Sequence, residues 1–422
     1  MTHYDLIVAG GGFSGVGAAL AAARNGLKVL LIERGNCLGG AAAVGLINPF
    51  MPYWTPLNGK NDSSRKKLSA GIFKEISDNL AKAGALASND MTFDEEYLKL
   101  LLNRMMKQAG VNLLYHSYVT DAEINDGKIN FITVANKSGN TKFTADYYID
   151  STGDGDVATI CGFPFMLGRE KDGLSQPMTL CFRLAGVDRE GFNNIRPSIN
   201  PLYKEFREQG KIKNIREDVL IFNTMKDDIL HFNSTRIVKK NPVDAFDITD
   251  AEIDAREQVH ELVAFLKDNF ECFKNAHLIM TAPQIGVRES RKIEGEYLLT
   301  ADDIKECIKF DDAIAAGNYD IDIHNPEGSG TFHYYFPDGE YYTIPYRSLI
   351  PKGSKNLLTA GRCISATHEA QASIRIIPIV CCIGEAAGTA VAVAFKNKTE
   401  LKSADINEIQ EILRKNGAFL GI

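Results

Sequence analysis

The first 33 residues carry the pattern that most constrains the fold. An apolar run at residues 5–9 indicates a buried strand, an alanine-rich stretch at 18–24 a helix, and a second apolar run at 28–32 another strand. Glycines with the spacing G-x-G-x-x-G lie between the first strand and the helix: Gly10, Gly12 and Gly15. Glu33 ends the second strand, near the position about 20 residues after the first glycine where an acid binds the adenosine ribose. This order predicts a dinucleotide-binding βαβ unit.

Each glycine has a separate physical role in such a unit. Gly10 allows the tight turn out of the strand, Gly12 lets a pyrophosphate approach the backbone, and Gly15 lets the helix pack closely on the strand. The start of the helix also offers free backbone N–H groups, and the helix dipole favours an anion there. These N–H groups belong to Phe13 and Ser14.

Length and composition set further bounds. A chain of 422 residues predicts two or three domains. The formal net charge of −7 and the lack of a long basic run argue against nucleic acid and an anionic membrane surface. Glycines and Ser14 break the apolar stretch at 6–23, so we expect no membrane span. A strand that begins at residue 5 leaves no room for a signal peptide.

The eight cysteines form no C-x-x-C motif and no zinc spacing. We therefore expect no metal site, and reduced thiols in a cytoplasmic protein. Cys37 is either a redox group or a small buried thiol, and Cys381-Cys382 either a vicinal disulfide or two free thiols. The polar and aromatic stretch at 45–67 is either a lid, part of a substrate pocket or an ordered surface loop.

The remainder of the first half predicts a sheet with an antiparallel insertion. Residues 94–110 have the apolar spacing of an amphipathic helix. Strands are expected at 111–115, 117–124, 128–136 and 142–149, with a hairpin turn at Asn125-Asp126-Gly127. Gly153, Gly155 and Ala158 repeat a glycine pattern, but Asp154 and Asp156 would repel a pyrophosphate. We therefore expect no second nucleotide site and no dedicated NADPH domain.

The opening pattern, Gly39-Gly40 and the sequence IDSTGDGDVA at 149–158 resemble FAD-dependent oxidoreductases of the glutathione-reductase-like superfamily. The stretches at 286–304 (GVRESRKIEGEYLLTADDI) and 361–394 (GRCISATHEAQASIRIIP…IGEAAGTAVAVA) resemble one large bacterial family of predicted FAD-dependent oxidoreductases. The resemblance covers nearly the whole chain. It implies FAD as the cofactor and an α/β fold, in which a Rossmann-like FAD-binding domain has a central parallel sheet and a small antiparallel insertion.

We expect the FAD-binding domain at 1–170 and 345–422, with an inserted α+β substrate or cap domain at 171–344. In that insertion, helices are expected at 202–209 and 251–269. Strands are expected at 176–185, 278–280, 334–336 and 341–344, with a hairpin turn at Asp338-Gly339. The chain is expected to return to the first domain through a strand at 356–361 and a helix at 379–395, followed by a last helix at 405–416.

The resemblance also implies which residues bind FAD. Those that would hold the pyrophosphate are Gly10, Gly12, Phe13, Ser14 and Gly15. Glu33 would bind the ribose, Arg34 would lie near the adenine, and Val119 would contact the adenine. The residues implied beside the pyrophosphate and ribitol are Gly39, Gly40, Ala41, Thr152 and Gly153. Gly361-Arg362 stands where many relatives have Gly-Asp, so the role of Arg362 at the ribitol is open.

The sequence predicts a proton-transfer site at Thr367-His368-Glu369, with Arg375 close by. This stretch lies between the last expected strand and a helix whose N-terminus, near Pro378, is expected to face the pyrimidine end of the flavin. Histidine suits proton transfer near neutral pH, and Arg375 could fix an anion. In the alternative, His368 and Glu369 only pair with each other. His333 and Tyr335 are weaker candidates for the opposite wall.

The charged stretch around Arg288 and Arg291 has two interpretations. It is either a structural ion-pair network, or one of these arginines anchors a substrate carboxylate or phosphate. The overall prediction is a FAD-dependent oxidoreductase that transfers a hydride between a small molecule and flavin N5. The alternatives are a non-catalytic or electron-transfer flavoprotein subunit, and an NAD-binding protein without flavin. The sequence does not predict the oligomeric state.

Overall fold

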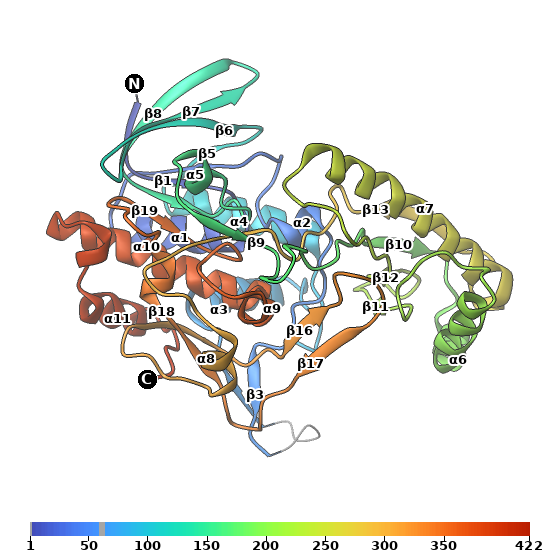
Figure 1. The fold of residues 1–422 in the computed structure, drawn as a ribbon. Coiled ribbons are helices and arrows are strands. Elements are labelled where there is room, and N and C mark those ends of the chain that lie inside the picture. The colour runs from blue at the N-terminus through green and yellow to red at the C-terminus, as the bar shows by residue number, and fades with distance from the viewer. Residues whose placement is uncertain (1, 59–63) are drawn as a thin grey trace.

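The computed structural model describes residues 2–58 and 64–422. Its largest sheet has seven strands, in which β5, β2, β1, β8, β7 and β6 lie side by side and β19 also pairs with β8 (Figure 1). The parallel strands are β1 (Thr2–Ala9), β2 (Val29–Ile32), β5 (Asn112–Leu114), β8 (Gly139–Asp150) and β19 (Leu357–Thr359). The α/β class and the central parallel sheet are confirmed.

The antiparallel insertion is a hairpin of β6 (Tyr118–Asn125) and β7 (Lys128–Asn136). Asp126 and Gly127 at its turn have φ values of 49° and 73°, the left-handed conformation that tight hairpins need at both central positions. The long strand β8 binds β7 through its first half and β19 through its last three residues. The hairpin and the returning strand therefore share one edge of β8.

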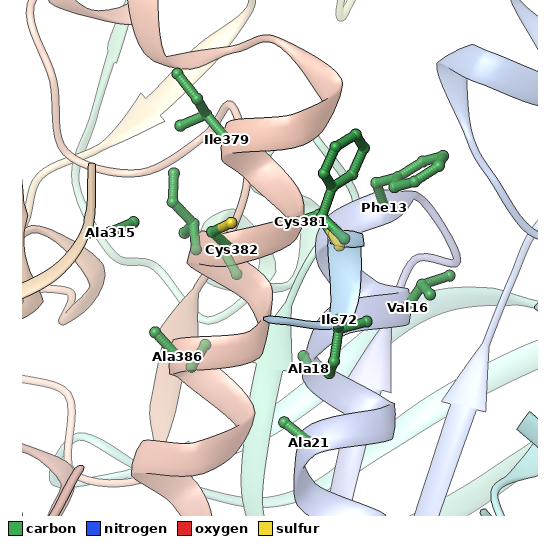
Figure 2. Close-up of a cluster of buried hydrophobic side chains, with 14 of the residues drawn as sticks. Phe13, Val16, Ala18, Ala21, Ile72, Ala315, Ile379, Cys381, Cys382 and Ala386 are labelled. Atoms are coloured by element: carbon green, nitrogen blue, oxygen red, sulfur yellow. The ribbon is translucent and has the colours of Figure 1, made fainter. Parts of the chain in front are cut away.

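Two glycine- and alanine-rich helices cross on one face of this sheet, α1 (Phe13–Arg24) and α10 (Ile377–Asn397). Side chains at the contact would clash with backbone, because a Cβ on Gly17 would lie 2.5 Å from the Cys381 carbonyl oxygen. A Cβ on Gly384 would lie 1.9 Å from the Ser14 carbonyl oxygen. Figure 2 shows the small and apolar side chains that fill the rest of this contact. The position of α10 thus fixes that of the glycine-rich helix start.

Helix α10 is long and apolar enough to cross a membrane, and no other helix in residues 2–58 and 64–422 meets that test. Its side chains are almost all buried inside the protein, which is the environment of a core helix. Cys381 and Cys382 lie in it as free, buried thiols, and Cys37 is also free and buried. Burial raises the pKa of the Cys382 thiol to about 12. These cysteines are therefore inert structural groups.

The structure has further helices, of which the one at 95–108 has clear signals at both ends. Asp94 caps the helix at 95–108 by accepting a hydrogen bond from the Tyr97 N–H, and Gly110 follows its end with a φ of 76°. The bounds of these helices are α2 (Ala41–Val44), α3 (Gly71–Lys82), α4 (Glu95–Gln108), α5 (Asp156–Ile160), α8 (Ala301–Lys305), α9 (His368–Ile374) and α11 (Ile406–Lys415). Two short 3₁₀ helices lie at Tyr346–Leu349 and Leu401–Ser403.

A second hydrophobic core surrounds a four-stranded antiparallel sheet in the order β11, β12, β10, β13. The strands are β10 (Phe182–Ala185), β11 (Ile221–Asn223), β12 (Leu230–Phe232) and β13 (His277–Thr281). Helices α6 (Arg189–Glu208) and α7 (Ala245–Asn269) pack with them, at the end of the molecule opposite α11 (Figure 1). A 3₁₀ helix lies at Glu271–Phe273.

The remaining strands form four short antiparallel pairs. These are β3 (Trp54–Pro56) with β4 (Arg65–Lys67), β9 (Phe165–Leu167) with β14 (Arg291–Ile293), β15 (Ala313–Gly317) with β18 (Tyr342–Pro345), and β16 (Ile321–His324) with β17 (Thr331–Tyr334). The predicted hairpin at Asp338-Gly339 is wrong, because β17 and β18 on either side of this turn pair with β16 and β15 instead. A local turn signal did not determine the strand partners.

The second core consists of buried residues between 178 and 285, together with Leu46. Buried residues from 299 to 344, such as Leu299 and Tyr342, belong to the core that surrounds α1 and α10. Within the stretch at 45–67, Tyr53 and Trp54 are buried in that first core, and residues 59–63 lie outside the described part. The division at 170/171 and 344/345 stays a prediction.

Candidate functional site

A cavity opens at the carboxyl ends of β1 and β8, beside the start of α1. We call it the nucleotide cavity. Its walls include these sequence-predicted residues: Gly10, Gly12, Phe13, Ser14, Glu33, Arg34, Gly39, Gly40, Ala41, Thr152, Gly153, Gly361, Arg362 and Arg375. Ligands of open α/β sheets bind at this edge, outside the carboxyl ends of the strands.

The three glycines of the opening pattern separate into two kinds. A Cβ on Gly10 would lie 2.3 Å from the Ser151 carbonyl oxygen, and one on Gly15 would lie 1.8 Å from the Gly10 carbonyl oxygen. A Cβ on Gly12 would have only the Gly40 Cα within 4 Å, at 3.9 Å, and the φ of Gly12, −66°, suits any residue. The fold therefore needs Gly10 and Gly15, whereas Gly12 leaves room beside the helix start for a ligand.

Glu33 is held by two backbone N–H groups. Gly11 N–H donates to Oε2 and Gly35 N–H donates to Oε1, each at 2.6 Å. These bonds leave carboxylate lone pairs for ribose hydroxyls. A side pocket beside Glu33 is lined by Arg34, Tyr118 and Val119, so Val119 lies where an adenine would be expected. Arg34 donates to Gln284 Oε1 at 3.1 Å.

Arg362 also lines the nucleotide cavity, where it forms an ion pair with Asp154. Burial alone would raise the pKa of Asp154, but Arg362 and the hydrogen bond from Ser290 lower it below its usual value. Asp154 therefore holds Arg362 in place. In place of the Gly-Asp motif, this chain has Gly361-Arg362, and the arginine is held by Asp154 of the IDSTGDGDVA stretch.

That stretch does not build a second nucleotide site in the described part of the chain. Its helix α5 has five residues and leads into β9, which pairs with β14. Asp156 pairs with Arg291. Burial, followed by the charges of Asp154 and Asp150, raises the pKa of Asp156 to about 6. Of the two arginines considered as substrate anchors, Arg291 thus belongs to a structural ion pair.

A second cavity, of about 420 Å³, lies between the two hydrophobic cores, and we call it the inner cavity. Its apolar lining residues include Ile47, Pro49, Met51, Leu220, Phe222, Val287, Ile376 and Ile377. Its polar and charged lining residues include Arg216, Glu217, Asp218, Asn233, Arg288, Tyr319, Asp322, His324, Thr331, His333 and Arg375. Because Ile47, Pro49 and Met51 are among the apolar residues, part of the stretch at 45–67 lines this cavity.

The hairpin of β16 and β17 supplies four of these polar groups. Asp322 lies opposite His333 and His324 opposite Thr331, so all four side chains share one face. Burial, followed by the charge of Arg288, lowers the pKa of His324 to about 3, which keeps its ring neutral. Tyr319 donates to Asp322 Oδ2 at 3.0 Å.

His368 lies outside both cavities. It is buried at the start of α9, and its Nδ1 lies 2.7 Å from Glu289 Oε2, with Lys292 2.5 Å from the other oxygen of Glu289. The carboxylate that binds His368 is thus Glu289 and not Glu369. Arg375, by contrast, lines both cavities. The structure therefore separates the two residues that the sequence grouped as catalytic, and a catalytic role for His368 stays a prediction.

Sequence reasoning missed most of the inner cavity. The segment 284–287 lines the nucleotide cavity, and Asp322 and His324 line the inner one. A signal was present in residues 319–324, YDIDIH, where charged side chains alternate with isoleucine in the two-residue period of a strand. Within the described residues, no group of three or more His, Cys, Asp or Glu side chains is placed to hold a metal ion.

The site fits FAD on two observations. Gly12 leaves space at a helix start, and the Nε atoms of Arg362 and Arg375 are buried donors without a hydrogen-bond partner in the described structure. Both arginines line the nucleotide cavity, where the acceptor oxygens of a dinucleotide could satisfy them. Fold and site define a Rossmann-like dinucleotide-binding protein.

The sequence profile of the FAD dependent oxidoreductase family matches residues 5–413, so the chain belongs to this family and its cofactor is FAD. No curated protein matches the sequence. The fold is similar to that of a geranylgeranyl bacteriochlorophyll reductase-like protein from Thermoplasma acidophilum. The identity is 12% and the TM-score 0.50, over 99% of this chain and 85% of that chain.

Two other solved structures have TM-scores of 0.49. A p-nitrophenol 4-monooxygenase from Pseudomonas putida DLL-E4 is 11% identical, over 98% of this chain and 85% of that chain. A triple mutant of a flavin-dependent brominase is 14% identical, over 98% of this chain and 84% of that chain. At such identities the likeness concerns the fold alone.

Proposed function

We propose that this oxidoreductase transfers a hydride between FAD, bound in the nucleotide cavity, and a small molecule bound in the inner cavity. The observation that carries the proposal is that the two cavities share a wall. The shared residues are Ala41, Gly286, Val287, Arg362, Arg375 and Ile377. A dinucleotide and a second small molecule can therefore meet at this wall, as hydride transfer requires.

The shared wall is electropositive. Helix α10 begins there at Ile377, and no side chain among the described residues caps its N-terminus, so its free N–H groups and dipole face the junction. Arg375 adds a full positive charge, and its contact with Asp322 is long, at 3.4 Å. When bound, FAD supplies the two-electron chemistry, and these groups would stabilise negative charge on its reduced form.

Two histidines line the inner cavity and are the candidates for proton transfer there. His324 is kept neutral by burial and by Arg288, which lower its pKa. His333 is more exposed, and its Nδ1 lies 2.5 Å from Asp320. A histidine held by a carboxylate has a fixed orientation and can exchange protons with solvent. We therefore assign the proton-transfer role to His333.

The inner cavity also favours an enzyme over an electron-transfer subunit. An electron carrier needs its cofactor near a protein surface and has no need of a built pocket beside it. Here about 420 Å³ of space, lined by both apolar and charged residues, adjoins the cofactor site. We further propose a cytoplasmic location, because all eight cysteines are free thiols. We also propose a substrate domain at 171–344.

The proposal is tested with the FAD-loaded protein under anaerobic conditions. Small molecules are screened for bleaching of the oxidised flavin, and reduced protein is then mixed with oxygen, quinones or NAD(P)⁺ to find the acceptor. Bleaching that saturates with concentration, and that His333→Gln slows by about 10²-fold or more, is the expected result. Flavin that no small molecule reduces, but that a protein electron donor reduces rapidly, would instead establish the electron-transfer alternative.

A further inference from the structure

Arg288 differs from the other arginines of the inner cavity in lacking an acidic partner. Arg216 pairs with Asp218, Arg362 with Asp154, and Arg375 with Asp322. In the described structure Arg288 forms no ion pair. Its Nη1 donates to the Pro177 carbonyl oxygen at 2.6 Å and its Nη2 to Asn233 Oδ1 at 3.4 Å. Both partners are neutral.

The surroundings of Arg288 make this arrangement costly. Burial, followed by the positive charges of Arg375 and Arg216, lowers the pKa of its guanidinium to about 9, and the charge of Asp322, which makes no ion pair with Arg288, offsets only part of this shift. The side chain still carries its charge at neutral pH, inside the protein and beside other cations. Removing a charge from water without an ion pair at contact distance is unfavourable. An anion that entered the cavity would offset this cost.

The other lining residues define which anion fits. Arg216, Arg362 and Arg375 each have an acidic partner, so the single unpaired charge of Arg288 matches one negative charge better than a dianion such as a phosphate monoester. A carboxylate carries a single charge, and a guanidinium binds it through two parallel hydrogen bonds. The lining also includes apolar residues that can contact the body of such a molecule, Met51 and Phe222 among them.

We propose that the inner cavity binds a small monocarboxylate with an apolar body, and that Arg288 is the residue that anchors its carboxylate. The proposal rests on the proposed function, since the same cavity would hold the substrate of hydride transfer. The carboxylate binds at Arg288, and the apolar body lies along the wall formed by Ile47, Met51, Leu220 and Phe222. Arg291, which pairs with Asp156 outside this cavity, takes no part.

The test is ligand binding to the FAD-loaded protein, followed by the change in flavin absorbance and by equilibrium dialysis. The probes are benzoate, phenylacetate and hexanoate, their amides, and inorganic phosphate. At least one acid is expected to bind about tenfold or more tightly than its own amide, and phosphate is expected not to compete with it. If no acid binds better than its amide, or if phosphate displaces the acid, the proposal is overturned.

Variants locate the anchor. Arg288→Gln is expected to weaken acid binding by about 10- to 100-fold, as loss of a charge-assisted bidentate pair does. Arg288→Lys keeps the charge but not the two parallel donors of the guanidinium, and its affinity for the acid is expected to fall between those of Arg288→Gln and wild type. Arg291→Gln is the matched control and is expected to bind the acid as the wild type does. FAD content and thermal unfolding are measured first for each variant.

Equal acid binding by wild type and by FAD-loaded Arg288→Gln would overturn the assignment. So would loss of acid binding in Arg291→Gln with retention in Arg288→Gln. These results are separate from the proposed function. Flavin bleaching by an uncharged substrate would contradict the carboxylate class but support hydride transfer. Tight acid binding without any bleaching would support the carboxylate class but contradict hydride transfer from that acid.

Discussion

Arg362 and Asp154 form an ion pair across 208 residues of sequence, at the wall between the two cavities. The pair joins the chain that follows β8 to the chain that follows β19, and these strands are neighbours in the sheet. Ser290 donates to the same Asp154 oxygen at 2.6 Å. Three segments that surround the cofactor site therefore meet at one carboxylate.

Breaking this pair is expected to destabilise the protein. Arg362→Met leaves Asp154 buried with only Ser290 as a side-chain donor, and we expect a loss of about 3 kcal/mol in the free energy of unfolding. Adding Asp154→Asn to Arg362→Met is expected to restore most of that loss but not the affinity for FAD. Urea unfolding and FAD titration of the two single variants and the double variant measure both effects. Additive losses of stability would show that the two side chains do not interact.

Glu385 in α10 is expected to make stability depend on pH. It accepts a hydrogen bond from the Ile72 N–H at 2.9 Å, at the start of α3, and burial raises its pKa from 4.5 to about 7. Because the folded-state pKa is the higher one, its contribution to stability is fully present below pH 4.5 and is lost as the pH rises through 7. The full loss corresponds to about 3 kcal/mol.

Glu385→Gln should therefore be more stable than wild type at pH 8, and the difference should vanish near pH 4. Midpoints of thermal unfolding across this range measure it. Glu208→Gln serves as the control, since Glu208 pairs with Lys204 on the exposed surface of α6 and is expected to contribute less than about 1 kcal/mol. A pH-independent difference between Glu385→Gln and wild type would contradict the shifted pKa.

His368 and His333 are expected to give opposite results. His368→Gln removes the ring that binds Glu289, outside both cavities. We expect a loss of stability of about 1–3 kcal/mol and a rate of flavin reduction within about threefold of wild type. His333→Gln should keep its stability and lose about 10²-fold or more in rate. A 10²- to 10⁴-fold slower His368→Gln with normal FAD content would instead support the sequence-based catalytic assignment.

The cofactor half of the site was readable from sequence because its signals are local. The turn after β1, the helix start and Glu33 lie within one βαβ unit, and neither Gly10 nor Gly15 can carry a side chain there. The hairpin turn at Asp126-Gly127 is local in the same sense. Such patterns depend on the geometry of a few consecutive residues, so residue types and their spacing are enough to predict them.

The inner cavity was not readable, because it is assembled from segments far apart in the chain. Arg216, Arg288 and Asp322 come from three such segments, and no local rule places them together. His368 shows the same limit, since its position was predicted near the flavin but the orientation of α9 turns its ring toward Glu289. Which face of a short helix meets a cavity is decided by tertiary packing.

The FAD content of Gly12→Val tests the central claim most directly. The backbone at Gly12 accepts a side chain and the space beside it is open, so the variant should fold. Gly328→Val is the control, because a Cβ there also meets nothing within 4 Å and Gly328 lies away from the nucleotide cavity. FAD released per protein chain is measured for folded samples of both. The account predicts a full complement in Gly328→Val and almost none in Gly12→Val; a folded Gly12→Val that retains its full FAD would contradict it.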